Sequence, residues 1–298
     1  MGSGITVRSL APGEDGFPAG EGEWRFVAED QGRRIGSVSL SVAPTTSNPA
    51  WLGALPSHEL TASGFDLPWD GDYLEIGSRL LTSAAGALGD AVPDQVQTRV
   101  NRDFHDHVEE RRALLEGSGL NLFQEKQGFR WVDDGTPIEV SPRLAFGTVE
   151  EIGTAAFAAV MGRCGEGTLD RNDRYYWGGC GAENWAEQMM VYQDPKDAAM
   201  WLVGQMGNDP VGFIAIGSDE DWGATIVHIG VVPEHRGHGY IDDLLAAGTS
   251  SAQGAGIATM LSDVDTFNQP MAAAMRRNRH MDHNPWHVWD YRGRMVSP

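Results

Sequence analysis

Apolar residues in the second half of the chain follow two different spacings, which predict separate helices and strands. Residues 149–162 place apolar side chains close to one helical face, and this pattern predicts a helix. Apolar runs at 200–206 and 211–216 predict two strands, and the turn residues at 207–210 predict a hairpin between them. A further apolar run at 225–232 predicts a third strand.

The pattern continues toward the C-terminus in the order turn, helix, strand, helix. The helix after the turn has Ile241, Leu244 and Leu245 on its apolar face and acidic residues near its start, where the helix dipole favours negative charge. Residues 257–261 predict another strand, and residues 271–279 predict another helix. Together with the preceding strands, this order predicts a mixed α/β (α+β) domain with helices flanking a central sheet.

The first half repeats this order of elements with weaker patterns. Its predicted elements are strands at 24–28 and 35–42 joined by a hairpin at 31–34, a helix at 74–88, a strand at 96–101, a helix beginning at 107–115 and a closing segment at 127–131. Because the order of elements matches at about half-chain spacing, we predict a duplicated unit. Acidic, Gly and Pro residues at 131–137 predict a linker, so we expect one domain at 1–135 and a second at 136–298.

The composition narrows the classes of partner. Of the 298 residues, 41% are hydrophobic, which is ample for packed cores. The formal net charge of −20 divides equally between the two predicted domains. Such an acidic chain repels phosphate backbones and anionic membranes, so we expect no nucleic-acid or membrane partner. Cys164 and Cys180 predict two reduced thiols, and with no apparent secretory signal we expect a cytoplasmic protein.

Histidines near the C-terminus do not predict a metal site. His280, Asp282, His283 and His287 match no standard zinc spacing, and no cysteine accompanies them. We therefore expect a solvated terminal segment and no bound metal.

The segment Val231–Ile241 carries the clearest chemical pattern, because it joins a predicted strand to a predicted helix through a glycine-containing turn. Backbone N–H groups at such a turn converge with the positive end of the helix to form an anion site. Gly237 and Gly239 allow a close backbone approach, and Arg236 adds a charge suited to phosphate. The spacing matches neither a Walker loop nor a dinucleotide fingerprint. Spacing alone leaves two interpretations open, a phosphate-binding turn or a glycine turn beside a surface arginine.

This segment reads Val-x-Pro-x-x-Arg-Gly-x-Gly and leads into an amphipathic helix, and it resembles the acetyl-CoA pyrophosphate loop of the GNAT superfamily of N-acetyltransferases. Residues 263–271, which contain Asn-x-Pro-Met, resemble the fifth strand and following helix start of the family. The resemblance covers about residues 138–290. The first half is similar in element order and has a Gly-Phe pair at 128–129, but Glu75–Arg79 stands where Arg-Gly-x-Gly is expected. The layout is similar to tandem members such as mycothiol synthase, with a degenerate first repeat.

The resemblance implies acetyl-CoA as the acyl donor and a set of residues that contact it. These residues are Ile229, Gly230, Val231, Val232, Arg236, Gly237, His238, Gly239, Tyr240, Ile241 and Asn268. Four positions depart from the family pattern. Ile241 replaces a small residue, Met275 stands near the usual tyrosine acid, Thr225 stands near the usual base, and Arg279-His280 replaces the closing Gly-Phe pair.

Candidate catalytic groups follow from the reaction that the resemblance implies, direct attack of an amine on a thioester. A backbone N–H near Val231 can stabilise the oxyanion. Asp219, Glu220 and Asp221 are candidate bases, and Tyr175, Tyr176 and Tyr240 are candidate acids.

Strand alternation places Thr225 and Val227 toward the expected active side, so it assigns His228 to the core or the opposite face. Tyr175, Tyr176 and Trp177 are candidates for binding the acceptor, and a packed loop anchored by its aromatic side chains is the alternative. Trp185 and Met189–Met190 predict a helix face that packs on a core.

The expected function is acetyl transfer to an amine on a small molecule, and the acidic chain favours a cationic amine. A protein lysine or N-terminal amine is the alternative acceptor, and a non-catalytic acyl-CoA-binding protein is the alternative class. The oligomeric state is not predicted.

Overall fold

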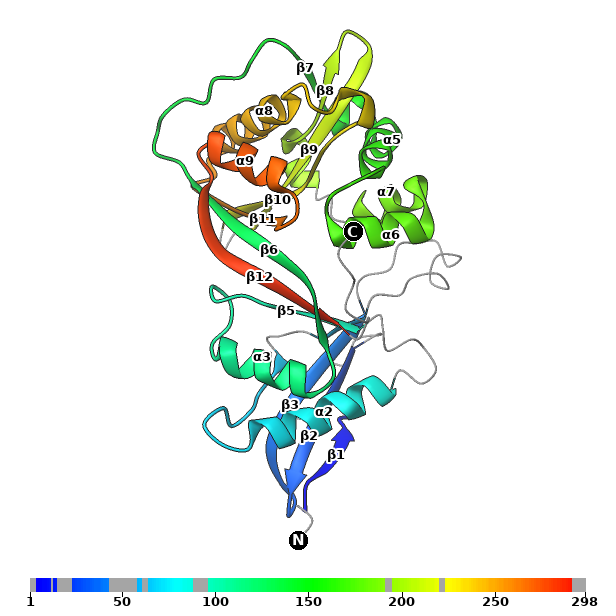
Figure 1. The fold of residues 1–298 in the computed structure, drawn as a ribbon, viewed down its shortest axis with the longest axis vertical. Coiled ribbons are helices and arrows are strands. Elements are labelled where there is room, and N and C mark those ends of the chain that lie inside the picture. The colour runs from blue at the N-terminus through cyan, green and yellow to red at the C-terminus, as the bar shows by residue number, and fades with distance from the viewer. Residues whose placement is uncertain are drawn as a thin grey trace. The chain divides into compact units, whose positions relative to one another are not determined.

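A computed structural model describes residues 4–11, 13–14, 23–42, 58–60, 64–87, 96–190, 195–219 and 223–290. The chain divides into two compact units, which Figure 1 shows in colours that follow the sequence. Unit 1 comprises Met1–Glu125 and Pro285–Pro298, and unit 2 comprises Lys126–Asn284. Each unit has a mixed sheet with helices packed on it, as the predicted α/β class requires.

The described residues of unit 1 form a mixed sheet with two helices. Its strands are β1 (Thr6–Ser9), β2 (Glu23–Asp30), β3 (Arg33–Val42), β4 (His58–Leu60), β5 (Val96–Val100) and the end of β12 (Met281–Asp290). They pair in this order, antiparallel except for the parallel pair β4–β5. Helix α2 (Tyr73–Ala87) connects the two parallel strands, and α3 (Val108–Gly117) follows β5.

Local chemistry explains the hairpin of unit 1, and apolar packing explains its core. Gln31 and Gly32 have φ values of 51° and 77°. Such positive values suit a two-residue turn between right-twisted strands, so the turn is tighter than the predicted 31–34. In the core, Leu80 of α2 packs with Leu114 of α3 and with Trp289 of β12.

Unit 2 is a second mixed sheet with helices on both faces. Its strands pair in the order β6 (Asn121–Val132), β11 (Thr259–Asp265), β10 (Gly223–Val231), β9 (Asp209–Asp219), β8 (Trp201–Met206) and β7 (Ala145–Thr148). Its helices are α4 (Val149–Ile152), α5 (Thr154–Gly165), α6 (Arg171–Cys180), α7 (Ala182–Met190), α8 (Tyr240–Gly254) and α9 (Gln269–Arg277), with short 3-10 helices η4 (Pro195–Met200) and η5 (Pro233–His235). Strand β10 is parallel to β11 and antiparallel to β9.

Alternating side chains on β9 separate two cores in unit 2. Ile214 packs with Leu245 of α8 and Met275 of α9, whereas the neighbouring Phe213 packs with Phe157 of α5 and Trp185 of α7. Figure 1 shows α8 and α9 on one side of these strands and α5–α7 on the other. Trp185 is fully buried, as its predicted helix face requires.

Strand β10 parts from β11 within unit 2. The two strands pair only at Ala224↔Met260 and Thr225↔Leu261, whereas β10 pairs with β9 as far as Val231. The register of β10 against β9 also shifts between Ile226 and His228, so β10 contains a β-bulge. The remainder of β10 therefore presents an open edge toward β11.

The closing strands do not follow the sequence halves. Residues 126–132 of β6 pair with β11 of unit 2, and residues 287–290 of β12 pair with β5 of unit 1. The predicted division at residue 135 placed all of β6 in the first domain and all of β12 in the second. Each unit is therefore completed by a strand from the other half of the sequence.

Three predicted segments differ from the structure. The helix at 149–162 is divided at Gly153, where φ is 85° and helical geometry ends. Residues 171–180 form a helix and not a loop, because Asp170 accepts the N–H groups of Asn172 and Asp173 as an N-cap. The C-terminal segment expected to be solvated instead forms β12, and His280 beside it is 1% exposed.

Three further findings bear on the composition. No helix in the described ranges is long and apolar enough to cross a membrane. Cys164 and Cys180 are both free cysteines. Among the described residues, histidine, cysteine, aspartate and glutamate side chains form no group suited to a metal ion.

Candidate active site

The loop before α8 has the backbone geometry of an anion site. Gly237 and Gly239 have φ values of 80° and 76°, a region that side-chain-bearing residues rarely adopt. A Cβ added at Gly237 would meet no atom within 4 Å, so the backbone there faces open space. The first N–H groups of α8 have no partner within the helix, and the helix dipole adds positive potential at the same place. The predicted phosphate-binding turn therefore has the required local conformation.

Arg236 holds this loop against the end of α5. Its Nε donates to the carbonyl of Val231 at 3.0 Å, and its Nη2 donates to the carbonyl of Cys164 at 2.9 Å. The guanidinium therefore positions the loop through backbone carbonyls, and a direct contact between Arg236 and phosphate stays a prediction.

Arg143, a residue outside the predicted site, braces the loop from the segment before β7. Its guanidinium donates to the carbonyls of His238 and Gly239 at 3.3 and 3.4 Å, and it lies 2.6 Å from buried Asp243. It also lies over the ring of Tyr240. Arg143 thus fixes carbonyl groups of the same turn whose N–H groups would face an anion.

The open edge of β10 supplies backbone donors beside the loop. Val232 donates its N–H to Val211 of β9, and the carbonyl of Val231 accepts from Arg236. Because amide directions alternate along a strand, the N–H of Val231 points away from β9 and toward the open edge. This direction agrees with the predicted oxyanion donor. Gly230 allows α5 to approach closely, since a Cβ there would lie 2.8 Å from Cβ of Cys164.

The bulge in β10 puts His228 in a core, one of the two places that the sequence allowed, but on the same face as Val227. Simple alternation assigned Val227 and His228 to opposite faces, but Val227 packs in the core that contains Phe213 and Trp185, and His228 contacts the same two rings. The His228 ring stacks on Phe213 with 5.6 Å between centroids and meets Trp185 edge-on at 4.9 Å. The extra residue in the bulge therefore turns His228 toward α6 and α7.

His228 pairs there with a carboxyl group from α6. Nε2 of His228 lies 3.4 Å from Oδ2 of Asp173, and both side chains are more than four-fifths buried. Burial lowers the pKa of His228 to about 4. Burial, followed by the neighbouring charge of Asp170, raises the pKa of Asp173 well above its usual range. At neutral pH the imidazole is therefore uncharged and can accept a proton.

Further charged side chains surround this pair. Nζ of Lys126, on β6, lies 2.6 Å from Oδ1 of Asp263 and 3.4 Å from Oδ2 of Asp170. Asp265 of β11 accepts the N–H of Arg171 at 3.0 Å and so ties the start of α6 to β11. We call the six residues Lys126, Asp170, Asp173, His228, Asp263 and Asp265 the charged cluster.

The other predicted site residues have separate contacts. Tyr240 donates its hydroxyl to Sδ of Met206 at 3.0 Å, and its ring lies beside His235 and His238 near the loop. Asn268 is the N-cap of α9 and accepts the N–H of Met271 at 3.3 Å. These contacts of Tyr240 and Asn268 involve neither His228 nor Asp173. Glu220 and Asp221 lie outside the described residues, and Asp219 ends β9 opposite Gly223.

The aromatic residues of α6 divide into two roles. Trp177 donates Nε1 to the carbonyl of Gly162 at 3.0 Å, so it anchors α6 on α5. Tyr175 and Tyr176 are half-buried on the same helix and meet each other edge to face. Substrate contact by these three residues stays a prediction.

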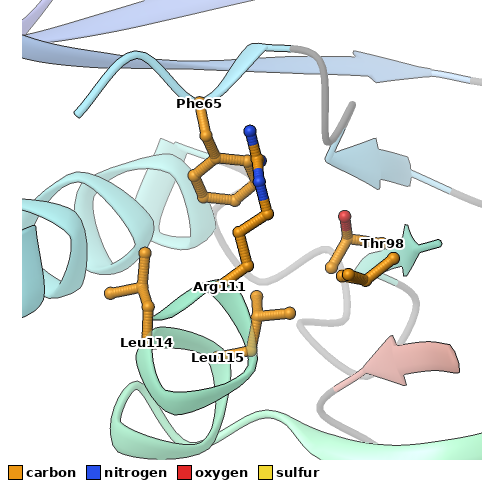
Figure 2. A pocket seen from close by; sticks show the side chains of 6 residues that line it. Phe65, Thr98, Arg111, Leu114 and Leu115 are labelled. Carbon is orange, nitrogen blue, oxygen red and sulfur yellow. The ribbon is translucent and has the colours of Figure 1, made fainter. Parts of the chain in front are cut away.

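Unit 1 contains a small pocket of different chemistry, shown in Figure 2. Its lining residues are Phe65, Thr98, Val100, Arg111, Leu114 and Leu115. Arg111 extends between Phe65 and Thr98 in this view, and its guanidinium lies 4.7 Å from the ring centroid of Trp69. Burial lowers the pKa of Arg111. The pocket therefore presents a packed cation and apolar groups, with no acid–base pair among its lining residues.

Unit 2 thus combines a mixed α/β sheet with a glycine turn at the start of α8 and a buried histidine–carboxyl pair. Residues 169–281 match the sequence profile of the Acetyltransferase (GNAT) family, so unit 2 carries a GNAT acetyltransferase domain. No curated protein sequence matches the chain.

Three solved structures are similar over most of the chain. A GCN5-related N-acetyltransferase from Sphaerobacter thermophilus aligns with a TM-score of 0.58 at 16% identity, covering 95% of this chain and 85% of that chain. One from Kribbella flavida has a TM-score of 0.57 at 15% identity, with coverages of 87% and 88%. A tandem GNAT protein from the clavulanic acid biosynthesis pathway has a TM-score of 0.56 at 14% identity, and the alignment covers 90% of this chain and 82% of that chain. These similarities support the predicted tandem GNAT fold.

Sequence analysis assigned His228 to the core or the opposite face and did not single out Asp173, Lys126 or Arg143, which the structure adds as candidate site residues. A β-bulge leaves no periodic pattern, so alternation could not show that His228 and Val227 share a face. One signal was available for α6, because Asp170 precedes Asn172 and Asp173 in the manner of an N-cap.

Proposed function

We propose that unit 2 transfers an acetyl group from acetyl-CoA to an amine on a small cationic molecule. The observation that carries this proposal is the His228–Asp173 pair, which lies where β10 parts from β11 within a GNAT acetyltransferase domain. The nitrogen of an attacking amine must lose a proton as the new bond forms, and a neutral imidazole is one group that can accept it.

The residues around the loop fit an acyl-CoA donor. The backbone at Gly237 borders open space, and a Cβ at Gly239 would meet Nη2 of Arg143 at 3.9 Å. The N-terminus of α8 favours the negative charge of a pyrophosphate. The residues from Ile229 to Val232 and from Arg236 to Ile241, with Asn268, would hold the donor. When bound, acetyl-CoA supplies a thioester carbonyl that an amine can attack.

Groups of the chain would assist this attack in two ways. His228 would accept the proton of the amine, and the negative charge of Asp170 would favour the resulting imidazolium. The N–H of Val231, directed toward the open edge of β10, would stabilise the oxyanion that forms on the carbonyl. The nitrogen lone pair would form the amide bond as the carbon–sulfur bond breaks, and the CoA thiolate would leave as a thiol by taking the proton that His228 had accepted.

The charge around the pair favours a cationic acceptor. The charged cluster contains four carboxyl groups and one lysine, and the whole chain carries a net charge of −20. An amine approaching as an ammonium ion would be attracted by this field and would then transfer its proton to the cluster.

Thiol release with a panel of amines tests the proposal. We expect purified protein to release CoA from acetyl-CoA with small diamines or amino sugars, and more slowly with neutral amines. His228→Gln should lower kcat by about 100-fold or more while CoA affinity, measured by calorimetry, stays unchanged.

Other outcomes separate the alternatives. CoA binding without thiol release from any amine would indicate an acyl-CoA-binding protein. A strong preference for peptide amines would indicate a protein acetyltransferase. Absence of CoA binding at millimolar concentration would reject the proposed function.

A further inference from the structure

Lys126 occupies an unusual position in the chain and in unit 2. The sequence contains only two lysines, Lys126 and Lys196. Lys196 is exposed, whereas the Lys126 side chain is about one-fifth exposed and its Nζ lies between carboxylates of Asp263 and Asp170. Partial burial of a charged amine costs solvation free energy, and the two neighbouring carboxylates offset this cost.

Several elements contribute charges around His228. Helix α6 and its N-cap supply Asp173 and Asp170, and β11 supplies Asp263 and Asp265. The neighbouring parts of α7 and β9 supply the uncharged rings of Trp185 and Phe213. Within the charged cluster, Lys126 of β6 is the group that carries a permanent positive charge.

We propose that Lys126 is a positioning residue that keeps His228 in the form that accepts a proton during acetyl transfer. Its contacts with Asp170 and Asp263 hold a positive charge beside the pair and offset two of the four carboxylates. This role rests on the proposed function, since it concerns the base of that reaction.

The direction of the effect follows from electrostatics. A nearby cation disfavours a second positive charge, so Lys126 lowers the pKa of His228, secondary to the effect of burial. Lys126 also lowers the pKa of Asp173, which burial and Asp170 otherwise raise. Without Lys126, three carboxylates would surround the pair unopposed, and His228 would take up a proton at a higher pH.

The origin of Lys126 adds a structural consequence. By sequence it belongs to the closing segment of the first half, yet residues 126–132 of β6 pair within unit 2. A fragment that begins at residue 136 would therefore lack both this strand and the lysine that acts on its base.

Lys126→Gln, compared with wild type across the pH range, tests the proposal. We expect the ratio of variant to wild-type kcat/KM to fall by roughly threefold or more between about pH 8 and about pH 5. The ratio cancels the ionisation of the amine substrate. Lys126→Arg should keep the wild-type profile because it keeps the charge. Lys196→Gln removes the same charge from an exposed site and should leave the ratio constant.

A second readout does not depend on turnover. Titration of ¹⁵N-labelled histidines by NMR, with His228 assigned from the His228→Gln spectrum, should show its midpoint at higher pH in Lys126→Gln. The double variant Lys126→Gln/Asp263→Asn removes one charge of each sign and should return the midpoint toward that of wild type. A role in packing alone would make the double variant no better than Lys126→Gln.

The outcomes distinguish the two proposals. An active wild type whose pH profile and His228 midpoint are unchanged by Lys126→Gln would overturn the role of Lys126. An inactive wild type would reject the proposed function, and the NMR titration would still decide whether Lys126 acts on His228. If Lys126→Gln does not fold, Asp263→Asn alone should move the titration of the pair in the opposite direction, toward lower pH, and no such movement would also overturn the proposal.

Discussion

Helices α2 and α8 occupy equivalent places in the two units, since each connects a pair of parallel strands, but the turns that precede them differ in chemistry. The turn before α8 contains Gly237 and Gly239 and is braced by two arginines. The turn before α2 contains Asp70 and Asp72, and Glu75 lies in the first turn of the helix. Both helices carry acidic residues in the first turn, and these are paired with arginines: Asp242 with Arg277, Asp243 with Arg143 and Glu75 with Arg79. The difference therefore lies in the turns. Aspartates in the turn before a helix repel a pyrophosphate, so we expect an anion site at the start of α8 and none at the start of α2.

The comparison also shows which residues of unit 1 correspond in position to the loop before α8. Sequence analysis placed it at Glu75–Arg79, but these residues lie inside α2. Gly77 packs against α3, because a Cβ there would lie 2.6 Å from the side chain of Leu114. Substitution of Gly77 would therefore disturb packing in unit 1 and would not test cofactor binding. The corresponding turn is at residues 69–72.

The largest expected effect concerns β6 and β12, which we call the exchanged strands because each completes the unit formed mainly by the other half of the sequence. Trp289 is 1% exposed in the core of unit 1, and Trp131 is 1% exposed in the core of unit 2. Trp289→Ala should destabilise unit 1 by about 3–5 kcal/mol, because it leaves a large cavity. Amide hydrogen exchange measured by mass spectrometry should show faster exchange in unit 1, while CoA affinity is retained.

Trp131→Ala is the matched variant, and it should destabilise unit 2 and abolish CoA binding. If Trp289→Ala instead loosened unit 2 and spared unit 1, the assignment of the closing strands would be incorrect.

The next effect concerns acid sensitivity, which should be greater in unit 2. Burial lowers the pKa of His280 from 6.5 to about 4. A histidine whose pKa is lower in the folded state stabilises the fold above about 6.5, and this contribution is lost as the pH falls toward 4. We expect a loss of about 2 kcal/mol at pH 5 from this residue.

Hydrogen exchange at several pH values can measure this loss in each unit. His280→Leu should flatten the pH dependence of unit 2 without altering that of unit 1. An unchanged slope in the variant would show that other groups control the acid response.

The smallest expected effect tests the loop chemistry directly. Gly237→Asn and Gly237→Asp both place a residue tolerated in the left-handed region at a site with open space around it. The backbone cost is therefore similar in the two variants, and they differ in charge. CoA should bind about tenfold more weakly to the aspartate variant than to the asparagine variant, which corresponds to about 1.4 kcal/mol.

Gly71→Asp introduces the same charge into the corresponding turn of unit 1 and should leave CoA affinity unchanged. Calorimetry should also report one CoA site per chain. Equal affinities of the two Gly237 variants, or a loss of affinity in Gly71→Asp, would contradict the contrast between the turns.

Much of the fold could be predicted because apolar periodicity follows directly from burial. Strands β8, β9 and β10, helix α8 and the hairpin of β2 and β3 lie close to their predicted ranges. Helix α6 escaped prediction because it contains Gly178 and Gly179 and few apolar residues, so its stability comes from the Asp170 cap and from Trp177 packing. Strand β12 contains Pro285 and several charged or polar residues, and its pairing with β5 depends on residues distant in sequence.

The candidate site was predictable only in its loop. Glycines at fixed spacing before a helix have a local conformational meaning, and Gly237 and Gly239 indeed adopt positive φ. The His228–Asp173 pair depends on a bulge and on the unpredicted α6, and Lys126 depends on an exchanged strand. These are tertiary arrangements that a spacing rule cannot encode.

The exchanged strands also determine the order in which the chain can mature on the ribosome. Domains commonly fold in order from the N-terminus during synthesis. Here every residue of unit 2 lies before Pro285, so that unit can close as soon as its own segment has emerged. Unit 1 must wait for Trp289 and its neighbours on β12, although most of its residues are made first. The half of the protein that is synthesised first is therefore completed last.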